Sequence, residues 1–190
     1  MSQLFALNQP LRSIFWPAHN KIVKEIGLVL FGIALLALSA QIVIPLQPVP
    51  LTFQSAMVVL IGMLYGARLS AFAVLGYFIA GSVGLPVFAH LTSGMGTFFG
   101  ATSGYLIGFL PAAFLSGFLA QRGWAKNVVS AFAAACLGAS VIFLFGWMML
   151  SHLIGMQQAF LLGVAPFAVT EPLKLLAVAL IAPRCWKIAK

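Results

Sequence analysis

Long apolar stretches, separated by short polar or Pro/Gly-rich breaks, run along most of the chain. An α-helix needs roughly 20 such residues to cross the hydrocarbon core of a bilayer. We therefore predict an all-α integral membrane fold of six transmembrane helices. Five of them are expected at about residues 22–44, 51–65 (a short one), 69–83, 97–119 and 128–150, and the sixth ends near residue 183.

The start of the sixth helix is left open by the pattern. It lies either near Ala159 or after Pro166. Proline is tolerated in a first turn, where its missing N–H has no intrahelical partner to lose. Thr170 as N-cap, followed by Glu171 and Pro172, is thus one candidate start near the external surface. The alternative is a longer helix broken near Pro172, with Glu171 close to the membrane midplane.

Composition supports the membrane assignment. Hydrophobic residues make up 63% of the chain and charged residues 6%, with a mean hydropathy of +1.11, whereas globular domains are about a quarter charged. We expect one membrane domain at residues 21–190 and an interfacial arm, not a cleavable signal, at residues 1–20. The net charge of +8 raises the possibility of nucleic acid, but the basic residues form no patch interleaved with aromatics, so we expect no such partner.

The basic residues predict an orientation. Nine of the ten flank the helices on one side, and the opposite connections carry none. By the positive-inside rule both termini are cytoplasmic and the uncharged loops face outward. The nine are Arg12, Lys21, Lys24, Arg68, Arg122, Lys126, Arg184, Lys187 and Lys190.

Lys174 is the tenth, and it lies inside a predicted membrane segment, three residues after Glu171. A charged side chain in hydrocarbon costs roughly 2.5–3.5 kcal/mol on insertion scales, so such residues mark pathways or binding sites. Positions i and i+3 share a helix face, so the two side chains can meet. The pair indicates a ligand site. The alternative is an ion pair that only orders the bundle.

Small residues recur every four positions on the fourth predicted helix, at Gly96, Gly100, Gly104 and Gly108. Such a stripe lets a neighbouring helix approach closely. Close packing is the expected role of most of these glycines. Some could instead open space for a ligand.

Two uncharged outward connections differ in character. Residues 40–55 hold three prolines and three glutamines, which predicts an extended, stiff strap. Residues 84–96 include His90 and are rich in glycine. Thr52 and Gln54 would supply neutral hydrogen-bonding groups at the outer end of the second helix. Together these segments suggest a covered pocket that opens outward. Ordinary short connections are the alternative.

These residues give the chain a recognisable pattern. It resembles the BioY family, the biotin-specific substrate-capture (S) components of energy-coupling-factor (ECF) transporters, over residues 27–187. The motifs that carry the resemblance are residues 41–54, 77–88, 100–109 and 163–174. The resemblance implies a six-helix S-component fold in the bacterial cytoplasmic membrane, with a biotin pocket under the first and third loops. It also implies a transmembrane coupling subunit and two ATPase subunits as partners.

The resemblance, combined with the chemistry of biotin, gives a set of expected ligand contacts. The ureido head needs acceptors for two N–H groups and a donor for its carbonyl, and the valerate tail carries a carboxylate. We expect Glu171 to contact the head and Lys174 to balance charge or meet the tail. The other expected contacts are Gln54, Thr52, Thr102, Tyr105, His90 and Trp147, the last of which could equally serve as an interfacial belt residue. No cofactor and no metal is expected.

Three departures from the family pattern accompany the resemblance. Thr170-Glu171 stands where the family usually has Gly-Asp, Gly100-Ala-Thr-Ser-Gly-Tyr105 replaces Gly-Pro-Thr-Gly-Gly-Tyr, and His90 lies in a stretch that is usually small and glycine-rich. Another vitamin or a biotin-like compound is therefore the main alternative as substrate.

A rival from another class is an intramembrane serine hydrolase. Ser103 would be its nucleophile and His152 its base. That mechanism requires the two side chains to lie within hydrogen-bond reach. The chain has no Gly-x-x-x-x-Gly-Lys-[Ser/Thr] phosphate loop, so we expect it to be no ATPase by that route.

Overall fold

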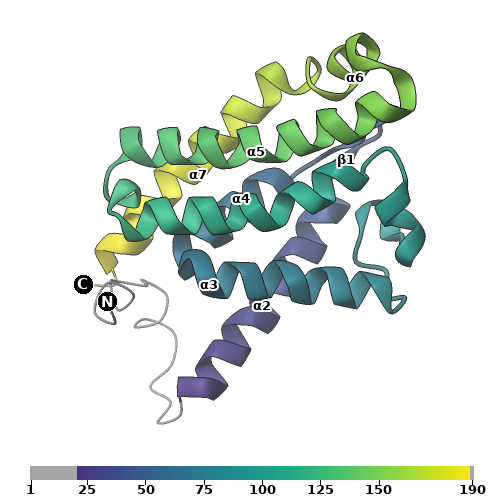
Figure 1. Ribbon diagram of the computed structural model, residues 1–190. Coiled ribbons are helices and arrows are strands. Elements are labelled where there is room, and N and C mark those ends of the chain that lie inside the picture. Colours follow the sequence, from purple (N-terminus) through teal and green to yellow (C-terminus); the bar gives the residue numbers. More distant parts are fainter. Residues whose placement is uncertain (1–20, 189–190) are drawn as a thin grey trace.

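The computed structural model describes residues 21–188, which form a helical bundle (Figure 1). The predicted interfacial arm lies outside these residues. The elements are α2 (Lys21–Gln41), β1 (Val43–Ile44), β2 (Leu51–Thr52), α3 (Gln54–Ser82), η2 (Ala89–Leu91), η3 (Met95–Phe99), α4 (Ser103–Gln121), η4 (Trp124–Lys126), α5 (Val128–Ile154), α6 (Met156–Gly163) and α7 (Phe167–Ile188).

Helix α3 is two antiparallel segments joined by a sharp reversal. Gly66 interrupts the helix with φ 78° and ψ 171°, a conformation open to glycine because it has no Cβ. Gln54 Nε2 then donates to Tyr77 Oη at 2.7 Å. In a straight helix these residues would be about 35 Å apart. The chain therefore turns back at Gly66, which confirms the predicted short second helix and the separate third helix.

The sixth span is a bent pair. Helices α6 and α7 meet at 49° across a short break, and together they are long and apolar enough to cross a membrane, as are α2, α3, α4 and α5. Counting the two segments of α3, the described chain has the six predicted spans in the predicted order. Helix α7 begins at Phe167, which matches the start after Pro166, and α6 begins at Met156, close to the alternative start near Ala159, so the two expected starts correspond to the two halves of the bent span.

Thr170 as N-cap is wrong, because α7 has already begun and the Thr170 hydroxyl donates back to the Phe167 carbonyl oxygen at 3.5 Å. The break near Pro172 is also wrong: Pro172 lies within continuous helix, and the chain bends before Phe167 instead. This bend leaves Glu171 and Lys174 in the first half of α7.

The glycines of α4 let neighbouring helices pack closely against it, as the glycine stripe predicts. A Cβ on Gly108 would lie 3.0 Å from Ile142 Cα, and one on Gly104 would meet the Phe145 carbonyl oxygen of α5. Gly117 packs on the reversal in α3, where an added Cβ would lie 2.7 Å from Ala67 Cα. Gly100 has open space around it. The close-packing role is thus confirmed for the inner part of the stripe.

The strap is a small hairpin rather than one extended segment. Val43 pairs with Thr52 and Ile44 with Leu51 in antiparallel register, and residues 45–50 return the chain between the two strands. Because this hairpin follows Gln41 directly, α2 ends three residues earlier than expected. Helix α4 begins at Ser103 rather than at Thr97, which lies in η3.

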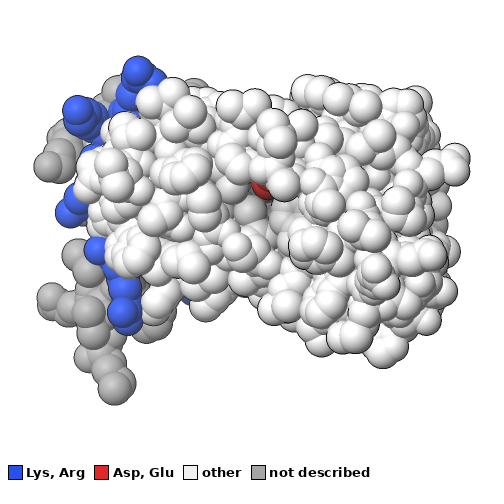
Figure 2. Space-filling model, turned by 90° about the horizontal axis from the view of Figure 1, so that it is seen from above, with Lys and Arg blue, Asp and Glu red and all other residues white. Residues whose placement is uncertain are grey.

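Basic side chains gather at one end of the molecule in the face shown in Figure 2. This is the end where the α4–α5 connection and the end of α7 lie (Figure 1). The strap, η2 and the α5–α6 connection lie at the opposite end. The two ends therefore differ in charge as the sequence predicts for a multi-pass membrane protein.

Candidate functional site

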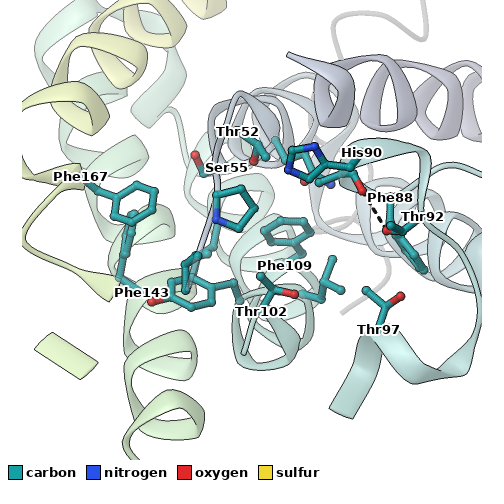
Figure 3. Close-up of a pocket in the computed structure, with 17 residues that line it drawn as sticks. Thr52, Ser55, Phe88, His90, Thr92, Thr97, Thr102, Phe109, Phe143 and Phe167 are labelled. Atoms are coloured by element: carbon teal, nitrogen blue, oxygen red, sulfur yellow. Dashed lines mark hydrogen bonds between the residues drawn. The ribbon is translucent and has the colours of Figure 1, made fainter. Parts of the chain in front are cut away.

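A cavity of about 260 Å³ lies at the end opposite the basic side chains. It forms where the strap, the loop between α3 and α4, and helices α3, α4, α5 and α7 converge (Figure 3). Its lining is mostly apolar, with a few hydrogen-bonding groups, which is typical of small-molecule sites. The lining residues are Val49, Pro50, Thr52, Gln54, Ser55, Phe88, Ala89, His90, Thr92, Thr97, Thr102, Tyr105, Leu106, Phe109, Ile142, Phe143 and Phe167.

One wall of the cavity is aromatic. Phe143 and Phe167 lie together with ring centroids 5.2 Å apart, and Tyr105 meets Phe143 edge to face at 6.0 Å. Figure 3 shows Phe143 and Phe167 on one side of the cavity and His90, Thr92 and Thr97 on the other. A flat, apolar ligand would therefore pack against the α5–α7 side and meet polar groups elsewhere.

Hydrogen bonds within the protein fix two of the polar side chains that line the cavity, Gln54 and Tyr105. Gln54 is buried and donates to Tyr77 Oη, which in turn donates to the Val87 carbonyl oxygen at 3.0 Å. Within residues 21–188 the second N–H and the carbonyl oxygen of the Gln54 amide have no protein partner, so both can meet a ligand. Tyr105 Oη donates to the Gly163 carbonyl oxygen at 2.7 Å. That bond ties the cavity wall to α6.

The ion pair predicted on the sixth helix forms. Lys174 Nζ lies 2.5 Å from Glu171 Oε2, and both side chains are at least nine-tenths buried. Lys174 Nζ also donates to the Thr52 carbonyl oxygen at 3.0 Å and to Ser55 Oγ at 2.8 Å. Glu171 Oε1 is buried and has no hydrogen-bond partner in the described chain. The ammonium group thus makes two hydrogen bonds and one ion pair, and the lysine ties α7 to the strap and to the start of α3.

Five of the eight predicted contact residues line the cavity: Thr52, Gln54, His90, Thr102 and Tyr105. Glu171 and Lys174 are not among the lining residues. They lie behind the wall, because Lys174 reaches Thr52 and Ser55 from the α7 side.

Trp147 is also not among the residues that line the cavity. Its Nε1 donates to the Met156 carbonyl oxygen at 3.2 Å. That bond joins the end of α5 to the start of α6.

Several lining residues were missed by the sequence-based prediction. Phe143 and Phe167 are two of 17 phenylalanines in the chain, and hydropathy does not separate a cavity-facing ring from a lipid-facing one. Thr92 and Thr97 lie in a loop whose irregular path no periodic pattern predicts. Ser55 could have been found, because it follows Gln54 at the start of the same helix.

Ser103 and His152 do not have the arrangement that a serine hydrolase requires. Ser103 Oγ is fully buried and has no hydrogen-bond partner in the part of the chain described. His152 lies in the last turn of α5 and is exposed. The nucleophile–base contact which that mechanism requires is therefore missing within residues 21–188.

Comparison with known proteins identifies the family. The family model described as "BioY family" matches residues 8–190. A protein from Pyrococcus horikoshii named "Probable biotin transporter BioY" is 39% identical over 161 residues, which cover 85% of this chain and 95% of that protein. The "Biotin transporter BioY" of Thermotoga maritima is 35% identical over 156 residues, covering 82% and 91%.

The fold also matches a solved structure. A crystal structure of "the S-component for biotin from an ECF-type ABC transporter" superposes with a TM-score of 0.81 over 90% of this chain and 95% of that one, at 24% sequence identity. The six-helix arrangement is thus that of an S component. On the family match and these relatives, the chain belongs to the BioY family.

Proposed function

We propose that this chain is the biotin-binding S component of an ECF transporter and serves biotin uptake across a bacterial cytoplasmic membrane. The observation that carries the proposal is the cavity opposite the basic end, which combines an aromatic wall with neutral hydrogen-bonding groups. The names of the relatives support the same ligand. The charge asymmetry supports an orientation in which the cavity faces outward and both termini are cytoplasmic.

The chemistry of the cavity suits a ureido head. Gln54 offers an acceptor and a donor on one planar amide, and Thr52 and Thr102 border the same space. The thiophane ring and the alkyl chain of biotin are apolar and would pack on Phe143 and Phe167. We propose that the head lies at the Gln54 end of the cavity and the chain extends toward the loop that contains His90.

The Glu171–Lys174 pair contributes to the site from behind in this proposal. Lys174 fixes Thr52 and Ser55, which both line the cavity. Glu171 Oε1 is buried and has no hydrogen-bond partner among the described residues, and we propose that it accepts from an N–H of the ligand head. The pair then holds the wall in place and supplies the acceptor for the head, while Lys174 balances the charge.

Energy for transport comes from partners in this proposal. The sequence contains no phosphate-binding loop of the Gly-x-x-x-x-Gly-Lys-[Ser/Thr] type. We propose a transmembrane coupling subunit and two ATPase subunits, with this chain acting as the substrate-binding component and not as an enzyme. An S component for a different vitamin is the second candidate, since the same fold could hold another apolar ring with polar edges.

Ligand binding to the purified full chain in detergent tests the proposal. Calorimetric titration with biotin, dethiobiotin, lipoate and unrelated vitamins should show saturable binding of biotin in preference to the others. Glu171→Gln and Lys174→Met should both weaken it, whereas the exposed Lys187→Met should not. Unchanged biotin affinity in both Glu171→Gln and Lys174→Met would show that the pair does not contribute to binding. Preference for another vitamin would favour the second candidate.

A further inference from the structure

His90 has an unusual position in the site. Of the residues that line the cavity, it is the one with a basic side chain, and the Tyr105 phenol is the other ionisable group among them. Its imidazole is exposed at the mouth (Figure 3). A ligand with a negative charge would otherwise enter a cavity lined only by neutral groups.

The backbone that carries His90 is strained. His90 has φ 58° and Leu91 has φ 56°, so two successive residues with side chains adopt the left-handed conformation. Such a conformation costs free energy and persists only where its surroundings enforce it, and it concentrates at ligand sites. A neighbouring element must therefore hold this turn.

Gln41, at the end of α2, holds it. Its Nε2 donates to the Phe88 carbonyl oxygen at 3.0 Å, and its Oε1 accepts from the Leu91 N–H at 3.1 Å. One side chain thus bridges the residues on either side of His90. Thr92 closes the same turn, because its hydroxyl donates to the Ala89 carbonyl oxygen at 2.8 Å.

The surroundings of the turn carry no competing charge. Residues 26–67 and 69–121, which include the end of α2, the strap, both segments beside the reversal of α3, and α4, contain no Asp, Glu, Lys or Arg. The ionisable groups of the helices around the cavity are tyrosines at 65, 77 and 105, Cys136 and His152 on α5, and the Glu171–Lys174 pair on α7. The remaining ones lie toward the basic end of the molecule: Lys21, Lys24 and Glu25 at the start of α2, Arg68 at the reversal of α3, and Arg184, Cys185 and Lys187 at the end of α7. Lys174 is already committed to an ion pair and two hydrogen bonds. His90 is thus the group best placed to meet an anion at the mouth.

We infer that the His90 imidazolium binds the carboxylate of the ligand at the cavity mouth, and that Gln41 is the positioning residue that holds His90 there. The inference rests on the proposed function, which supplies a ligand with an apolar chain ending in a carboxylate. An alkyl carboxylate stays ionised above about pH 5, whereas His gains its proton between about pH 5 and 8. Binding of the acid therefore strengthens as the pH falls through this range.

The experiment compares biotin with its neutral amide, biotinamide, by calorimetric titration of the full chain at about pH 5.5 and about pH 8. Biotin should bind about tenfold more tightly at the lower pH, the effect of one charge-assisted hydrogen bond at a partly exposed site. Biotinamide should bind equally at both. His90→Asn, whose side chain tolerates the left-handed backbone, should abolish the pH dependence, and His90→Lys should retain the preference for biotin at both pH values.

Two further variants separate positioning from general stability. Gln41→Leu should weaken biotin more than biotinamide, while the exposed Gln157→Leu on α6 should affect neither. A pH dependence that persists in His90→Asn, or that biotinamide shares, would overturn the inference while leaving biotin binding itself in place. Failure of both ligands to bind at either pH would instead overturn the proposed function.

Discussion

Lys174→Met isolates the contribution of the buried ion pair. Methionine has a similar length but carries no charge and donates no hydrogen bond. The substitution removes the ion pair to Glu171 and the bonds to the Thr52 carbonyl oxygen and Ser55 Oγ. Glu171 would then be a buried carboxylate without a partner, since its other oxygen has none in the described chain.

The expected cost follows from that unpaired charge. Breaking a buried pair by removing one partner costs about 3–5 kcal/mol, whereas replacing both charges together is often close to neutral. For a chain of this size each kcal/mol shifts the unfolding midpoint by about 2–4 °C. Lys174→Met should therefore unfold about 6–20 °C below the wild type. The double variant Glu171→Gln/Lys174→Met should recover most of that loss.

Thermal unfolding of the ligand-free protein in detergent measures these shifts without reference to any substrate. Lys187→Met, which removes an exposed lysine from the last turn of the same helix, is the matched control and should leave the midpoint unchanged. The reasoning fails if Lys174→Met is as stable as this control, or if the double variant is no more stable than the single one.

Three further predictions follow from the packing. Tyr105→Phe removes the hydrogen bond to the Gly163 carbonyl oxygen and should cost about 1 kcal/mol in thermal unfolding; an unchanged midpoint would contradict it. Gly117→Ala places a Cβ 2.7 Å from Ala67 Cα at the α3 reversal and should cost about 1–3 kcal/mol, while Gly100→Ala, in open space, should be neutral. Phe167→Ala removes part of the aromatic wall and should weaken biotin about tenfold or more in calorimetric titration, unlike the exposed Phe160→Ala.

Much of the fold was predictable because a bilayer imposes a simple pattern. Apolar length defines the spans, and the basic residues define their ends, so the break at Arg68 separated the second and third helices correctly. The ends of the helices were predicted less accurately than the spans themselves. The first helix ends at Gln41 rather than Ile44 because residues 43–52 form a hairpin, and a two-residue pairing has no hydropathy signature.

The site was predictable only where polar residues stand out against an apolar background. Thr52 and Gln54 were found because they lie at the outer end of a predicted helix, and Thr102 was expected from the resemblance to the BioY family. The contact of Glu171 with Lys174 followed from their i, i+3 spacing. The position of that pair behind the cavity wall was not predictable. It depends on the rotation of α7, which is set by packing of residues such as Leu175 and Val178 against the neighbouring helices.

The central claim is that the cavity between the strap and the helices holds biotin, and filling the cavity tests it most directly. Thr97 lines the cavity and is only half-buried, whereas Ser93 lies in the same loop, is exposed and does not line it. Biotin titration of the full chain should show binding in the wild type and in Ser93→Trp, and at least about tenfold weaker binding in Thr97→Trp. Wild-type affinity in Thr97→Trp would contradict the assignment of this cavity as the biotin site.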